Sequence, residues 1–163
     1  MKKLIVYMIF GISTCLSSLT WSYNAEMAQS YARLFADVSG AKAGKALHFI
    51  SPESFVADMK KGEEFVAIDV RTPGETELFT LSLPGSLVIP TSQVFTPEKL
   101  EMIPTDKSVV IICKSGARAT AVGTSLRHIG FNNVYILKGG FQGLASYYGP
   151  KQAYTDPAQS SSE

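Results

Sequence analysis

The chain has 163 residues, of which 45% are hydrophobic and 18% charged, so it holds enough apolar material for one compact core but not comfortably for two. Its 15 basic and 14 acidic side chains leave a formal net charge of +1 and form no long run of one sign. This balance gives no electrostatic basis for binding nucleic acid or an anionic membrane surface, so the expected partners are small molecules or proteins.

The N-terminus has the pattern of an export signal. Two lysines precede an almost uncharged stretch over residues 4–19, which grades into small and hydroxyl side chains. Thr20 and Ser22 are small enough for the two positions that a signal peptidase reads. We therefore expect residues 1–22 to be a cleaved signal peptide, the mature chain to begin at Tyr23, and the protein to be exported to the bacterial periplasm.

Two other interpretations of this segment stay open. The apolar stretch is close to the lower limit of about 17 residues for a membrane-spanning helix, so it could remain as an anchor facing the periplasm. Lipidation at Cys15 is the second, although Thr14 stands where a lipoprotein signal usually has glycine, alanine or serine. A membrane is an expected partner only in these two cases.

Cleavage would leave Cys113 as the only thiol, so that no internal disulfide could form. A lone thiol in an oxidising compartment is either buried and inert or kept for its reactivity.

After the signal, residues 23–46 are expected to form a helical segment and a connection. Asn24 can cap a helix whose apolar residues recur at helical spacing, and Gly40 can end it. Residues 42–45 are interpreted as the connection to a strand at residues 47–50.

From residue 51 onward, helices and strands alternate. Ser51 and Pro52 are typical of a helix start, and that helix is expected to end near Gly62. The next predicted elements are strands at 65–70, 87–89, 109–112 and 134–137, helices at 96–102, 117–129 and 144–148, and a turn at 72–74. The alternation predicts an α/β fold with a parallel sheet. Residues 151–163 are expected to be a polar tail.

The most informative segment runs from Cys113 to Arg118, between a buried strand and a helix. In an open parallel sheet the ligand crevice lies outside the carboxyl ends of the strands, where a helix N-terminus presents unpaired N–H groups. There the thiolate of Cys113, its nucleophilic form, gains hydrogen bonds and the charges of Lys114 and Arg118. Gly116 permits a backbone conformation in which successive amides point inward.

The structural alternative is that Cys113 is an ordinary core residue and that Ser115 and Gly116 only form a turn. The two cations beside the thiol favour function over this alternative.

Four motifs occur in order, and the sequence resembles the rhodanese superfamily through them from about residue 51 to residue 143. The motifs are Asp69-Val70-Arg71-Thr72-Pro73, Leu83-Pro84-Gly85-Ser86 before Ile89-Pro90, Cys113-Lys114-Ser115-Gly116-Ala117-Arg118, and Leu137-Lys138-Gly139-Gly140-Phe141. The resemblance implies a rhodanese-like domain over residues 47–150, with a five-stranded parallel sheet flanked by helices on both faces. It also implies no metal and no organic cofactor.

The resemblance further implies a thiosulfate sulfurtransferase with Cys113 as the catalytic residue. The Cys113 thiolate would attack the outer sulfur of a small anionic donor such as thiosulfate, and sulfite would leave. A persulfide would remain on Cys113 until a thiol or cyanide removed it. The substrate would be bound by the following loop residues: Lys114, Ser115, Gly116, Ala117 and Arg118.

In this scheme the loop amides stabilise the anionic sulfur, and Lys114 and Arg118 hold the donor's oxyanion. Asp69 and Arg71 are expected to brace the loop or the pocket wall, with a surface salt bridge as the alternative. The two histidines, His48 and His128, are assigned no catalytic role.

Four residues separate Cys113 from Arg118, whereas the related phosphatases and arsenate reductases have five, which favours sulfane sulfur over phosphate. With the cationic Lys114, the loop also resembles the loops of thiosulfate-using family members more than those of mercaptopyruvate-using members. A non-catalytic binding module is the main alternative function. The sequence departs from the family pattern in two places: residues 76–83 form a longer stretch than usual, and Phe141 stands where tryptophan is frequent. These departures concern the rim of the pocket and hence the substrate preference.

Overall fold

The computed structural model describes residues 22–150. The predicted signal peptide, except Ser22, and the predicted C-terminal tail lie outside these residues. Within them, no helix is both long and apolar enough to cross a membrane.

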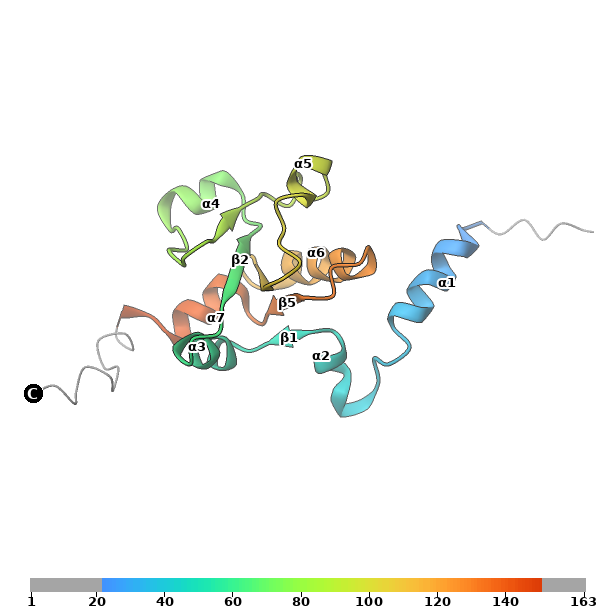
Figure 1. Ribbon diagram of the computed structural model, residues 1–163, viewed down its shortest axis with the longest axis horizontal. Coiled ribbons are helices and arrows are strands. Elements are labelled where there is room, and N and C mark those ends of the chain that lie inside the picture. Colours follow the sequence, from blue (N-terminus) through green and yellow to red (C-terminus); the bar gives the residue numbers. More distant parts are fainter. Residues whose placement is uncertain (1–21, 151–163) are drawn as a thin grey trace, which may run out of the picture.

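Five parallel strands form one sheet in the order β1-β5-β4-β2-β3, which confirms the predicted fold class (Figure 1). The strands are β1 (Phe49–Ile50), β2 (Phe65–Asp69), β3 (Leu87–Val88), β4 (Ser108–Ile112) and β5 (Val134–Leu137). The longest pairing joins β2 to β4, from Phe65 opposite Ser108 to Asp69 opposite Ile112. All strands run the same way, so the residues that follow β2 and β4 meet at one edge of the sheet.

The connecting helices cover both faces of this sheet. They are α1 (Ala25–Leu34), the short 3₁₀ turn η1 (Gly40–Lys42), α2 (Ala43–Ala46), α3 (Pro52–Lys60), α4 (Pro73–Leu78), α5 (Pro97–Leu100), α6 (Ala117–His128) and α7 (Gly140–Tyr147). Helix α6 packs on β4 and β5, while α3 and α7 pack against each other, and α1 projects away from the rest of the domain (Figure 1).

The central strand β4 supplies both halves of the core because its side chains alternate between the two faces. Val109 and Ile111 belong to the cluster under α6, and Val110 and Ile112 belong to the cluster under α3 and α7. All four side chains are fully buried. The apolar run therefore fixes β4 in the middle of the sheet, with Cys113 directly after it.

The N-terminal segment differs from its prediction. Asn24 caps α1 as expected, accepting a hydrogen bond from the Met27 amide at 2.9 Å, but the helix ends at Leu34. The predicted connection at 42–45 is wrong, because η1 and α2 make this segment helical. The strand that follows is shorter than predicted because His48 takes a φ of 56°, which an extended strand does not allow.

Two helix starts near the Cys113 loop were also predicted wrongly. The expected turn at 72–74 is the beginning of α4, since Thr72 caps that helix and Pro73 takes its first position. Helix α7 begins at Gly140, earlier than the predicted 144, because Gly139 and Gly140 adopt positive φ values of 70° and 55° and lead the chain into the helix. Helix α5 ends at Leu100, two residues before the predicted end.

Candidate active site

Cys113 lies where β4 ends and the loop to α6 begins. Its side chain is buried, with 1% of the residue exposed, and it borders the apolar cluster under α6. The sulfur nevertheless faces polar groups: Sγ accepts hydrogen bonds from the amides of Gly116 at 3.1 Å and Ala119 at 3.3 Å. Both amides belong to the N-terminal turn of α6, so their dipoles stabilise negative charge on this sulfur.

Sequence reasoning did not include Ala119 among the donors. The sequence predicts that the amides of residues 114–118 stabilise the sulfur. In the structure, the Gly116 amide is the member of this set that donates to Sγ. Gly116 has a φ of 102°, which a side chain would strain, and this conformation turns its N–H back toward Cys113.

Helix α7 holds the loop from behind. The amide of Phe141 donates to the carbonyl of Cys113 at 2.7 Å, and the amide of Gln142 donates to the carbonyl of Lys114 at 3.0 Å. In a trans peptide the carbonyl and the next N–H point in opposite directions. The amides of Lys114 and Ser115 therefore point away from α7, as an anion-binding loop requires.

Gly140 makes this contact possible. A Cβ at this position would overlap the carbonyl oxygen of Cys113 and come within 2.8 Å of the Gly116 nitrogen. Only a residue without a side chain lets α7 approach the loop so closely.

Asp69 and Arg71 form a buried ion pair beside the loop, not one on the surface. They are 1% and 3% exposed, and the guanidinium donates to both carboxylate oxygens at 2.7–3.0 Å. Arg71 also donates to the carbonyl of Phe79 at 2.6 Å and lies 4.2 Å from the ring centre of Phe141. The pair thus connects the end of β2 with α4 and α7, and a bracing role for it stays a prediction.

Arg118 has a partner that sequence reasoning missed. Both of its terminal nitrogens donate to the Glu75 carboxylate, at 2.8 and 2.7 Å. The same carboxylate accepts from the amide and the hydroxyl of Thr72, both at 2.9 Å, and so caps α4. A threonine three residues before a glutamate is the sequence signal of such a capping box, and it could have identified Glu75.

This pairing shifts both groups toward their charged forms. The hydrogen bonds from Arg118, followed by those from Thr72, hold the pKa of Glu75 far below its usual value. In turn Glu75, through its hydrogen bonds above all, raises the pKa of Arg118, and the nearby charge of Cys113 adds to the effect. Arg118 therefore lies within electrostatic range of the sulfur while it is bound to a carboxylate.

The other predicted site residues are placed as follows. Lys114 and Ser115 are exposed on the loop, and Ala117 is exposed at the start of α6. Neither histidine joins the site: His48 stacks on Tyr135, and His128 contacts α1 through Ser30.

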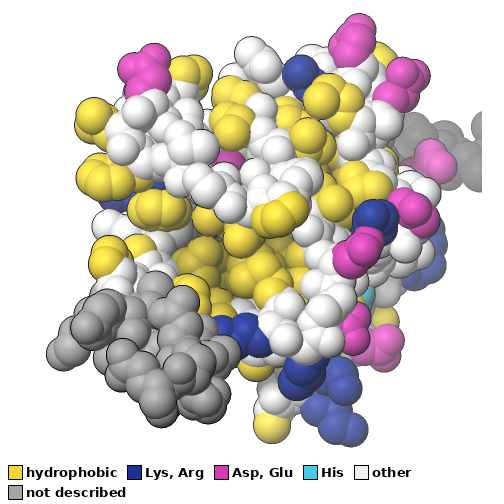
Figure 2. Space-filling view, turned by 60° about the vertical axis from the view of Figure 1, so that its left-hand side comes forward, with side chains coloured by type: hydrophobic (Ala, Val, Ile, Leu, Met, Phe, Trp, Pro, Cys, Tyr) yellow, Lys and Arg dark blue, Asp and Glu magenta, His cyan; other side chains and the backbone are white. Residues whose placement is uncertain are grey.

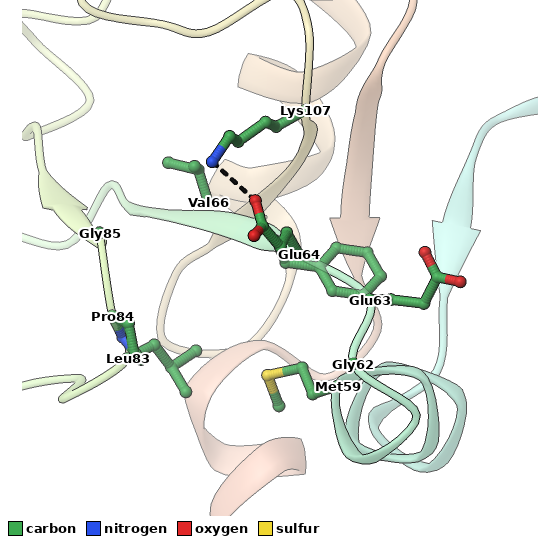
Figure 3. Close-up of a pocket in the computed structure, with 10 residues that line it drawn as sticks. Met59, Gly62, Glu63, Glu64, Val66, Leu83, Pro84, Gly85 and Lys107 are labelled. Atoms are coloured by element: carbon green, nitrogen blue, oxygen red, sulfur yellow. Dashed lines mark hydrogen bonds and ion pairs between the residues drawn. The ribbon is translucent and has the colours of Figure 1, made fainter.

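A cavity of about 470 Å³ lies at the opposite edge of the sheet from Cys113. It is lined by the start of β2 and by Lys107, the residue before β4, whereas Cys113 follows the end of β4. Figure 3 shows Met59 and Leu83 facing each other across it and the Glu64–Lys107 ion pair, 2.6 Å long, at its side. On the face that Figure 2 presents, hydrophobic side chains also line a hollow.

The parallel sheet and the loop after β4 define an α/β domain in which a buried cysteine is held at a helix N-terminus. The chain belongs to the family of rhodanese-like domains, whose sequence model matches residues 51–147.

Relatives of known name agree with this membership. A sulfurtransferase of Allochromatium vinosum is 33% identical over 91 residues, which cover 56% of this chain and 81% of that protein. The probable adenylyltransferase/sulfurtransferase MoeZ of Mycobacterium tuberculosis is 29% identical over 101 residues, which cover 62% of this chain but only 25% of that protein. The chain thus spans about a quarter of MoeZ.

Among solved structures, a rhodanese-related protein from Thermoplasma volcanium superimposes with a TM-score of 0.53 and 27% identity. The match covers 63% of this chain and 95% of that one. The likeness thus extends over nearly the whole of that rhodanese-related domain.

Proposed function

We propose that this protein is a sulfurtransferase that carries sulfane sulfur as a persulfide on Cys113. The observation that supports this most directly is the pair of amide hydrogen bonds, from Gly116 and Ala119, on the Cys113 sulfur. A cysteine that only fills space in the core does not require two backbone donors aimed at its sulfur. Membership of the rhodanese-like family and the sulfurtransferase names of two relatives point the same way.

In the first half-reaction, the Cys113 thiolate attacks the outer sulfur of a donor such as thiosulfate or a persulfide. A bond forms between the Cys113 sulfur and the outer sulfur of the donor, and the bond between the donor's outer and inner sulfur breaks. The rest of the donor leaves with that electron pair, as sulfite in the case of thiosulfate. The outward-pointing amides of Lys114 and Ser115, together with that of Gly116, offer hydrogen bonds to the anionic sulfur.

In the second half-reaction, a thiol or cyanide takes the outer sulfur and regenerates the Cys113 thiolate. No step requires an oxidant, because the sulfane sulfur changes carrier without a net change of oxidation state.

The direct test is turnover with thiosulfate and with a small alkyl persulfide as donors and cyanide as acceptor, measured as thiocyanate formed. We expect Cys113→Ser to lose activity by at least about a thousandfold, because an unactivated serine hydroxyl is a poor nucleophile and cannot carry the sulfur as a persulfide. A variant that keeps the wild-type rate would contradict the proposal. It would instead favour a binding module whose pocket recognises a partner without chemistry.

We also propose that the protein acts outside the cytoplasm, in the periplasm, on the basis of the export-signal pattern in residues 1–22. N-terminal sequencing of the protein recovered from cells tests this, and a first residue of Tyr23 is the expected result. An intact N-terminus would instead favour the anchored alternative.

A further inference from the structure

We propose that Glu75 makes the site selective for the persulfide of an apolar thiol over the thiosulfate dianion. This donor preference presupposes the sulfur transfer through Cys113 proposed above. Two features around the loop support it: the small amount of positive charge that is not already paired, and the apolar side chains beside the loop.

Arg118, the arginine of the loop, is already paired with Glu75. Its two oxygens bind both terminal nitrogens of Arg118, and the two side chains are 28% and 32% exposed, so the pair is partly shielded from water. A donor oxyanion that approaches this guanidinium must displace Glu75 or lie beside its negative charge. Because that repulsion grows with the donor's charge, a dianion is penalised more than a monoanion.

Within residues 22–150, the other two cations expected at the site are Arg71 and Lys114, and only Lys114 is free to meet a donor. Arg71 is used by Asp69 and by the carbonyl of Phe79. Lys114 is exposed and forms no ion pair with any residue in the described range 22–150. One free positive charge on the loop matches the single negative charge of a persulfide anion better than the two charges of thiosulfate.

Apolar side chains flank the same loop. The amide of Phe141 holds the Cys113 carbonyl, and its ring centre lies 6.4 Å from that of Phe79. Phe79 is 64% exposed and Leu78 is 79% exposed. Leu78 follows Glu75 by three residues on α4, so it lies on the same side of that helix as the carboxylate that binds Arg118.

These side chains offer an apolar surface, and thiosulfate has no apolar group that could pack against it. The organic group of a persulfide can cover them while its sulfane sulfur enters toward Cys113, which is 1% exposed.

The transfer balances without a further reagent. The Cys113 thiolate attacks the terminal sulfur of the persulfide anion R–S–S⁻, the new S–S bond forms, the bond to the inner sulfur breaks, and R–S⁻ leaves with the electron pair. The transferred sulfur keeps its negative charge, so no proton has to move.

The test measures persulfide formation on Cys113 in single turnovers, by rapid quench and intact mass, with thiosulfate and with freshly generated hexyl persulfide. Each rate constant is divided by that of free glutathione with the same donor, which removes the donors' intrinsic reactivity. For the wild-type protein we expect the corrected rate constant to be higher with hexyl persulfide. Glu75→Gln should raise the thiosulfate rate constant by roughly tenfold and change that for hexyl persulfide far less, because the freed Arg118 then meets the dianion.

Matched variants separate this effect from structural damage. Glutamine can still accept the Thr72 amide, so the α4 cap is retained in Glu75→Gln. Glu77→Gln removes the same charge from the same helix, and because Glu77 makes no hydrogen bond to Arg118 it should leave the donor ratio unchanged. Phe79→Ser should slow transfer from hexyl persulfide and not from thiosulfate.

Three results would overturn the selectivity: a wild-type preference for thiosulfate after correction, an equal effect of Glu75→Gln on both donors, or the same change of ratio in Glu77→Gln. Failure of Cys113 to take up sulfur from either donor would contradict the sulfur-transfer function itself, which keeps the two proposals distinguishable.

Discussion

At the scale of single residues, the environment of Cys113 decides its chemistry. Its burial among apolar side chains alone would be typical of an inert core cysteine. The amides of Gly116 and Ala119 distinguish it from that case, because they place the positive end of α6 on the sulfur.

The acid sensitivity of the fold follows from Glu75. Its pKa lies below the ordinary value of 4.5 because Arg118 and Thr72 bind the carboxylate. A carboxyl with a lowered pKa in the folded state stabilises the protein above its unfolded pKa, and that stabilisation is lost as the pH falls through the range below about 4.5.

We therefore expect the free energy of unfolding, measured with urea, to decrease less from pH 6 to pH 3 in Glu75→Gln than in the wild type. The matched variant Glu77→Gln should follow the wild type. Parallel curves for Glu75→Gln and the wild type would show that the Glu75–Arg118 pair does not contribute to stability in this range.

At the scale of elements, the site depends on two helices that meet the loop from different sides. Helix α6 turns its N-terminal amides toward the sulfur, and α7 holds the loop carbonyls through Phe141 and Gln142. The orientation of the loop is therefore set by α7 as much as by α6.

Gly140→Ala tests this arrangement. The new Cβ would overlap the Cys113 carbonyl, so we expect the loop to shift and the rate of sulfur transfer to fall by roughly a hundredfold, as a displacement of about 1 Å can cause. Gly40→Ala is the matched control, because Gly40 has nearly the same φ, 54° against 55°, with open space around it.

Both alanine variants should lose about 1 kcal/mol or more of stability through backbone strain. Only Gly140→Ala should also lose activity, and equal activities of the two variants would mean that the contact with α7 is not needed.

What the sequence predicted at this scale depended on the kind of signal. The Val-Val-Ile-Ile run at 109–112 predicted a buried strand correctly, because four consecutive β-branched residues favour a strand that is covered on both faces. The start of α7 was missed, because two consecutive glycines usually mark the end of a strand and the start of a loop. Only the close approach of Gly140 to Cys113 explains why they lie at a helix start here. The Glu75–Arg118 contact joins residues 43 apart in the chain, and spacing alone does not reveal such a partner.

At the scale of the whole molecule, the rhodanese-like domain and the N-terminal helix are separate in their packing. Helix α1 buries no residue, and Met27 on it is 55% exposed. Its contacts with the domain include a hydrogen bond of 3.2 Å between the Ser30 hydroxyl and Nε2 of His128, and a stack of Tyr31 on the same ring with centres 4.1 Å apart.

These two contacts, one hydrogen bond and one aromatic pair, should together stabilise the domain by about 2 kcal/mol, so we expect deletion of residues 23–38 to lower its stability by an amount of that order. His128→Ala in the full chain removes both contacts and should cost a similar amount, as measured by thermal unfolding. A deletion that unfolds the domain while His128→Ala does not would show that α1 contributes through other contacts.

The central claim is that Cys113 carries the transferred sulfur, and the most direct measurement is the intact mass of the protein after incubation with thiosulfate or an alkyl persulfide. We predict a mass increase of one sulfur atom, located on Cys113, lost on treatment with cyanide, and absent in Cys113→Ser. Protein that gains no sulfur from either donor, or that gains it equally without Cys113, would contradict the account.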